Sequence, residues 1–70
     1  MKFHIAINLE RIDDTIDMCA VRDHTIEMIK MADKAGFEVA WAAEHHAWAM
    51  WIAANPLQIM CWWASRTQNI

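Results

Sequence analysis

The sequence predicts an α/β fold in which two strands alternate with two helices, in the order strand, helix, strand, helix. Three observations lead to this prediction. An apolar pattern of period two covers residues 2–9, a helical apolar stripe follows and stops at the only glycine, and a capped apolar segment covers residues 56–67. This alternation favours parallel strands joined by right-handed crossover connections.

Residues 2–9 are expected to form the first strand, because bulky apolar side chains alternate there with small or polar ones. The bulky face is expected to hold Phe3, Ile5, Ile7 and Leu9, and the other face His4, Ala6 and Asn8. Residues 38–43 are expected to form a second strand, with Val39 and Trp41 on one face and alanines on the other. The second strand is short and follows a helix terminator.

The first helix is expected over residues 16–35, beginning between Asp14 and Met18, where acids can cap the helix and complement its dipole. Gly36 is expected to end it in the left-handed conformation, with Phe37 folding back on the last turn. One apolar stripe at helical spacing is expected to comprise Met18, Val21, Thr25, Met28, Ile29, Ala32 and Ala35.

The second helix is expected over residues 56–67. Asn55 is a competent cap, Pro56 suits the first helical position, and Gln58 can complete a capping box. Because this helix is apolar nearly all round, we expect it to be buried on several sides.

The composition indicates a partial domain. Hydrophobic residues make up 57% of the 70 residues, with five tryptophans, which is more apolar surface than so short a chain can bury alone. We therefore expect residues 1–70 to be one partial domain, truncated before a third strand, that forms an oligomer or depends on the rest of a larger fold.

Charge and hydropathy exclude several classes of function. The net charge of −3 comes without a basic cluster, which argues against nucleic-acid binding. No apolar run approaches the roughly 18 residues expected of a membrane span, and the N-terminus lacks the pattern of a signal peptide. A cytoplasmic protein is expected.

The most informative short motif is Glu44-His45-His46, directly after the second strand. An imidazole, with a pKa of about 6.5, can exchange protons near neutral pH, so this motif is a candidate acid–base corner. The same three residues could instead form a small metal site, but adjacent histidines rarely both bind one ion. They could also be polar residues without a catalytic role, lying between two buried apolar segments. The chain would then be a non-catalytic α/β module that self-assembles through its apolar faces.

Three segments, MKFHIAINLER, DHTIEMIKMADKAGFEVAWAAEHH and IAANP, together resemble the N-terminus of luciferase-like flavin-dependent monooxygenases. The resemblance covers residues 1–67, and its most specific part is AD-x-AGF-x-x-x-W-x-x-EHH followed by NP at a helix start. His4 departs from the glycine common in the family, and inside a barrel its imidazole would need a hydrogen-bond partner. Ala54 replaces a frequent proline, residues 47–51 are more apolar than usual, and family members are several times longer.

This resemblance implies that the chain is the first quarter of a (β/α)₈ TIM barrel. Such an enzyme activates O₂ on reduced FMN, or uses a deazaflavin in some relatives, to oxidise a small organic substrate such as an aldehyde, alkane or sulfonate. A flavin reductase is an expected partner. The 70-residue chain alone is expected to be inactive, because later strands and loops complete the flavin site.

The resemblance also implies roles for individual residues. His45 matches the acid–base histidine near the flavin, and Glu44 lines the same site, while His46 is expected to be structural. Asn8 either ends the first strand or faces this pocket as a further cofactor-binding residue. A substrate pocket is expected to be walled by Trp48, Met50 and Trp51, although these side chains suit a core or an interface equally well.

Overall fold

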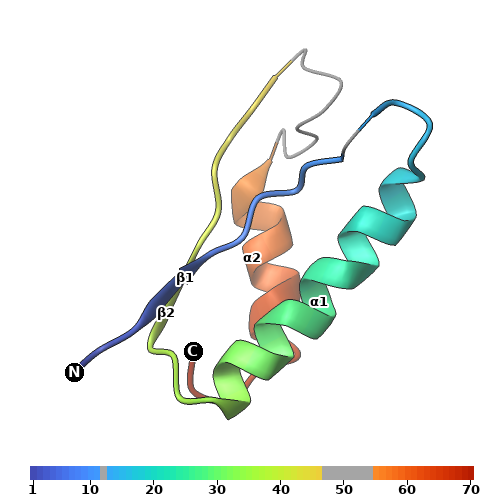
Figure 1. The fold of residues 1–70 in the computed structure, drawn as a ribbon. Coiled ribbons are helices and arrows are strands. Elements are labelled where there is room, and N and C mark those ends of the chain that lie inside the picture. The colour runs from blue at the N-terminus through green and yellow to red at the C-terminus, as the bar shows by residue number, and fades with distance from the viewer. Residues whose placement is uncertain (12, 47–54) are drawn as a thin grey trace.

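A computed structural model of the chain describes residues 1–11, 13–46 and 55–70. It contains strand β1 (His4–Ala6), helix α1 (Met18–Lys34), strand β2 (Val39–Trp41) and helix α2 (Pro56–Ala64), in that order (Figure 1). The α/β fold class and the strand–helix–strand–helix order are therefore confirmed.

The two strands pair in parallel, with Ile5 opposite Ala40. Each strand is shorter than the expected segments 2–9 and 38–43, because regular pairing to a single neighbour covers only three residues. Backbone bonds continue the contact by one step at each end, from the Glu38 N–H to the Phe3 carbonyl and from the Ile7 N–H to the Trp41 carbonyl, both 2.9 Å. The helices pack on one side of this strand pair (Figure 1).

Helix α1 begins and ends at the residues whose chemistry suits those positions. The Asp17 carboxylate accepts a hydrogen bond from the Cys19 N–H at 3.2 Å and caps the N-terminus. At the other end Gly36 has φ of 89°, and the Phe37 N–H bonds to the Ala32 carbonyl at 3.0 Å. The Gly36 N–H bonds to the Asp33 carbonyl at 3.2 Å, which completes a Schellman motif.

We expect Gly36→Ala to destabilise the protein by about 1–2 kcal/mol. The space around Gly36 is open, so an added Cβ would meet no atom within 4 Å and the penalty would come from the positive φ alone. Urea unfolding followed by circular dichroism measures it, with Ala35→Gly at the preceding C-cap as the matched control. Equal stability of Gly36→Ala and the parent protein would contradict this interpretation.

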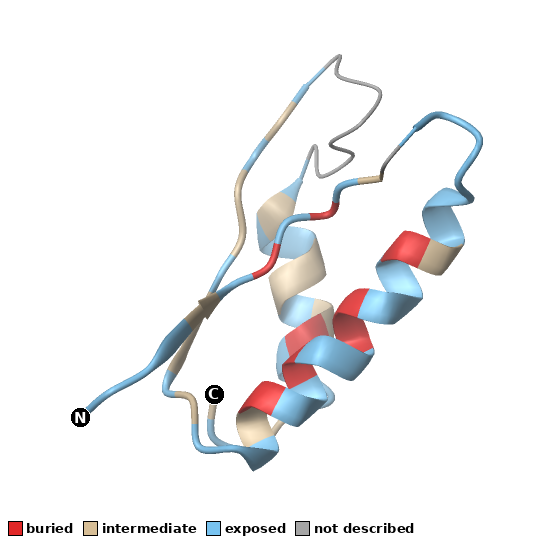
Figure 2. Cartoon of the chain, viewed as in Figure 1, coloured by how far each residue is buried: buried red, intermediate tan, exposed pale blue. Residues whose placement is uncertain are grey.

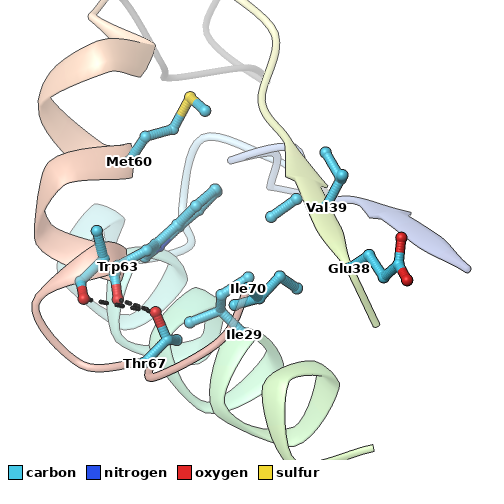
Figure 3. A pocket seen from close by; sticks show the side chains of 9 residues that line it. Ile29, Glu38, Val39, Met60, Trp63, Thr67 and Ile70 are labelled. Atoms are coloured by element: carbon cyan, nitrogen blue, oxygen red, sulfur yellow. Dashed lines mark hydrogen bonds between the residues drawn. The ribbon is translucent and has the colours of Figure 1, made fainter. Parts of the chain in front are cut away.

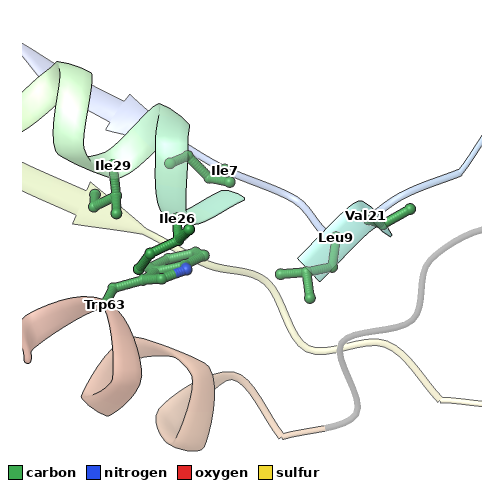
Figure 4. Packing of buried hydrophobic residues seen from close by; sticks show 6 residues of the cluster. All are labelled: Ile7, Leu9, Val21, Ile26, Ile29 and Trp63. Carbon is green, nitrogen blue, oxygen red and sulfur yellow. The ribbon is translucent and has the colours of Figure 1, made fainter. Parts of the chain in front are cut away.

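The face of α1 that is buried differs from the expected stripe. Met18 and Met28 are 50% and 44% exposed, and Ile26, outside the predicted stripe, is buried. The buried residues of the helix are Val21, Thr25, Ile26, Ile29 and Ala32. Ile26 lies beside Trp63 of α2 in the core (Figure 4), so the buried face includes the flank of α1 next to that helix.

The core lies between the helices and the inner face of the strands (Figures 2 and 4). It consists of Ile7, Leu9, Val21, Ile26, Ile29 and Trp63, with Ile5 and Ala40 among the partly buried residues packed against it. Trp63 is 2% exposed, and its Nε1–H donates to Thr25 Oγ1 at 3.0 Å, so the two buried polar groups satisfy each other.

Helix α2 starts as expected: Asn55 Oδ1 accepts from the Gln58 N–H at 3.2 Å, and Pro56 is the first helical residue. It ends at Ala64 rather than at residue 67. The expected burial on several sides is not observed, because Trp63 is its only buried residue and Leu57 is 73% exposed. One helix and two short strands cannot cover a helix that is apolar all round.

Candidate functional site

The candidate site lies at the carboxyl ends of β1 and β2. Because the strands are parallel, both of these ends, and the segments that follow them, lie at the same end of the fold, the upper end in Figure 1. In α/β folds ligands bind beyond the carboxyl ends of the strands. The sequence-predicted residues Asn8, Glu44 and His45 all lie in these segments, with His46 beside them.

Within the Glu44–His46 segment the carboxylate contacts the second histidine. Glu44 Oε2 lies 2.8 Å from His46 Nε2, and both side chains are about 60% exposed, at 60% and 63%. On extended backbone, residues two apart project to the same side and the residue between them to the other. Glu44 and His46 therefore contact each other, while His45 lies between them in the sequence and is half-buried.

The other predicted site residues have different outcomes. Asn8 is exposed just beyond β1, at the same end of the fold as His45. The expected substrate wall of Trp48, Met50 and Trp51 lies outside the described residues.

Sequence reasoning missed a contact on the sheet face that turns away from the helices. There the Trp41 Nε1–H donates to His4 Nδ1 at 3.3 Å, and the ring centroids are 6.1 Å apart. This bond supplies the partner that the imidazole of His4 was expected to need. It also fixes Trp41, which is 57% exposed, as an aromatic surface on that face. The sequence signal for this contact was the alternation expected in residues 38–43, which placed Val39 and Trp41 on one face of the second strand.

The segment between β1 and α1, which borders the site, is held by local hydrogen bonds. Arg11 Nη1 donates to the carbonyls of Asp14 at 3.3 Å and Ile16 at 3.2 Å. The Asp13 carboxylate accepts from the Thr15 hydroxyl and from the Thr15 N–H, the latter at 2.9 Å. These two bonds, the hydroxyl first, hold the pKa of Asp13 below its ordinary value.

The described residues give no support to a metal site or to a membrane-spanning helix. Within residues 1–11, 13–46 and 55–70, no three His, Cys, Asp or Glu side chains are grouped so that they could hold a metal ion. The metal-site alternative for Glu44, His45 and His46 therefore gains no support from this part of the chain. None of the described helices is long and apolar enough to cross a membrane.

The family model for luciferase-like monooxygenases matches residues 1–70. The chain is 31% identical over all 70 residues to the oxygenase component of a flavin-dependent trigonelline monooxygenase from Acinetobacter baylyi (strain ATCC 33305 / BD413 / ADP1), and covers 19% of that protein. A crystal structure of apo-MsnO8 superimposes with a TM-score of 0.88 and 26% identity, over 99% of this chain and 20% of that one. The chain thus spans about a fifth of the length of both proteins.

Proposed function

Because the chain belongs to the luciferase-like monooxygenase family, we propose that it forms the first quarter of a (β/α)₈ barrel that oxidises a small organic molecule with O₂ and reduced flavin. The observation that carries the proposal is the position of Glu44–His46 at the carboxyl end of β2, where barrel enzymes place their catalytic groups. The flavin is FMN, and a separate reductase supplies it in reduced form, in keeping with the relative that is named an oxygenase component.

The described residues fit one part of a flavin better than another. An amide at Asn8, a half-buried imidazole at His45 and the Glu44–His46 pair offer donors and acceptors for the polar edge of the ring. In the described parts of the segments that follow β1 and β2, the one Lys or Arg is Arg11, which bonds to carbonyls of its own segment. We therefore assign these residues to the ring and not to the phosphate.

Each residue has a separate role in this proposal. Bound flavin supplies the oxygen chemistry, and the protein supplies position and proton transfer. His45 gives and takes a proton through an imidazole nitrogen. Glu44 holds His46 through its Nε2 atom. Asn8 orients the ring by hydrogen bonding from the end of β1.

A direct test of the proposed function is oxygenase activity. The complete barrel protein that would contain this chain is supplied with FMN and a flavin reductase, and O₂ uptake is compared with substrate oxidised, beginning with trigonelline because a relative is named for it. We expect tight binding of reduced FMN and O₂ uptake coupled to oxidation of a small organic substrate. If the protein binds neither oxidised nor reduced flavin, the proposal is wrong.

The isolated 70-residue chain is expected to behave differently. With only two strands and no phosphate site among the described residues, it should bind FMN weakly and show no turnover. Titrating FMN while following tryptophan fluorescence measures this affinity, with riboflavin, which lacks the phosphate, as the matched control ligand. Equal, weak affinity for the two ligands is expected. Saturable micromolar binding of FMN by a monomer would contradict the expectation.

The alternative of a self-assembling module rests on a different observation. Large apolar side chains are exposed on several elements of the isolated chain, including Phe3, Met31, Trp41 and Leu57. Size-exclusion chromatography distinguishes the two cases: a sharp dimer or tetramer supports self-assembly, and a monomer or a broad aggregate supports dependence on a larger fold.

A further inference from the structure

Asp33, near the C-terminal end of α1, binds a segment that lies far from it in the sequence. Its Oδ2 accepts from the Gln68 N–H at 3.0 Å, and its Oδ1 accepts from the N–H groups of Asn69 and Ile70 at 2.9 and 3.0 Å. One carboxylate thus satisfies three successive backbone donors, an arrangement that suits an anion. The same bonds hold the pKa of Asp33 below its ordinary value.

Ile70, which this contact positions, lies against the core. Ile70 is partly buried, packs on the core cluster and lines a pocket of about 230 Å³ (Figure 3). The pocket lies between α1, β2 and α2, and its other walls include Ile29, Val39 and Trp63.

Apolar burial alone does not account for the ordering of residues 68–70. Gln68 and Asn69 are exposed, so Ile70 is the only one of these three residues with an apolar contact in the core. Ordering the backbone of three residues carries an entropy loss that burial of one half-covered isoleucine does not offset. The three bonds to Asp33 supply the missing stabilisation.

We propose that Asp33 is a positioning residue for the chain that leaves α2. Its carboxylate fixes the path of residues 68–70 across the end of α1 and seats Ile70 as a wall of the pocket beside β2. The two oxygens have separate roles, because Oδ1 holds Asn69 and Ile70 whereas Oδ2 holds Gln68. This positioning is independent of flavin binding and of the proposed reaction.

Two substitutions test these separate roles by amide hydrogen exchange in the protein. Asp33→Ala removes both acceptors, so the amides of residues 68–70 should exchange at least about tenfold faster, the effect of losing a bond to a charged group. Asp33→Asn keeps one carbonyl oxygen and points an NH₂ group at the third donor. We therefore expect Gln68 to be released more than Asn69 or Ile70.

Glu27→Gln, at an exposed position on the same helix, is the control and should leave these amides unchanged. The amides of Ile26 and Ile29 report on the helix itself. Faster exchange confined to residues 68–70 supports the proposal. Unchanged exchange of these residues in Asp33→Ala, or an equal acceleration of the α1 amides that signals general unfolding, would overturn it.

Discussion

Trp63→Ala is expected to destabilise the protein by about 3–5 kcal/mol, the range typical of large-to-small aromatic substitutions in a core. Trp63 is almost fully buried and belongs to the cluster that joins α1, α2 and the end of β1. The substitution also leaves Thr25 Oγ1 without its indole donor. Because small domains have thin stability margins, this loss is large enough to unfold a marginal one.

Urea unfolding followed by circular dichroism measures this effect, and the neighbouring tryptophan is the matched control. Trp62 is half-buried, and Arg22 lies over its ring at 5.8 Å, so Trp62→Ala should be clearly less damaging. Trp63→Phe should keep most of the packing and lose about 1 kcal/mol with the hydrogen bond. If Trp62→Ala proved as harmful as Trp63→Ala, the assignment of the core would be wrong.

His45→Asn is expected to lower the oxygenase turnover rate by about 10²–10⁴-fold, the usual contribution of a general acid or base. Asparagine is similar in size and polarity but cannot exchange a proton near neutral pH. Steady-state O₂ uptake by the complete enzyme and by the variant provides the measurement. His24→Asn, at an exposed position on α1, is the control and should retain full activity.

Substitutions of the neighbouring His46 distinguish a role in positioning from a role in proton transfer. His46→Gln places an amide nitrogen where Nε2 was and can still donate to Glu44, whereas His46→Asn cannot reach it. We therefore expect Gln to preserve more activity than Asn at position 46, and both to be milder than His45→Asn. A larger loss at position 46 than at position 45 would reverse the two assignments.

The features that could be predicted from the sequence are those determined by a few adjacent residues. Asn55 and Pro56 begin α2, and Gly36 ends α1, because capping depends on local backbone geometry and short side chains. The buried face of α1 could not be predicted in full. Whether Met28 or Ile26 is covered depends on where α2 packs, and helical spacing alone does not contain that information.

The same distinction applies to the candidate site. The strands were expected to be parallel and Glu44 follows the second of them directly. The location of the site at the carboxyl ends of the strands could therefore be predicted. The choice of His46 as the partner of Glu44 depends on how the backbone extends after Trp41, which the motif does not specify. The contact of Asp33 with residues 68–70 joins positions about 35 apart, and no local pattern signals it.

The most direct test of the central claim is a crystal structure of the protein with FMN bound. The claim predicts the flavin ring at the carboxyl ends of β1 and β2. A nitrogen of His45 should lie within hydrogen-bonding reach of a polar ring atom, roughly 2.6–3.2 Å or through one water. A flavin bound at the opposite end of the strands, with His45 remote from its ring, would contradict it.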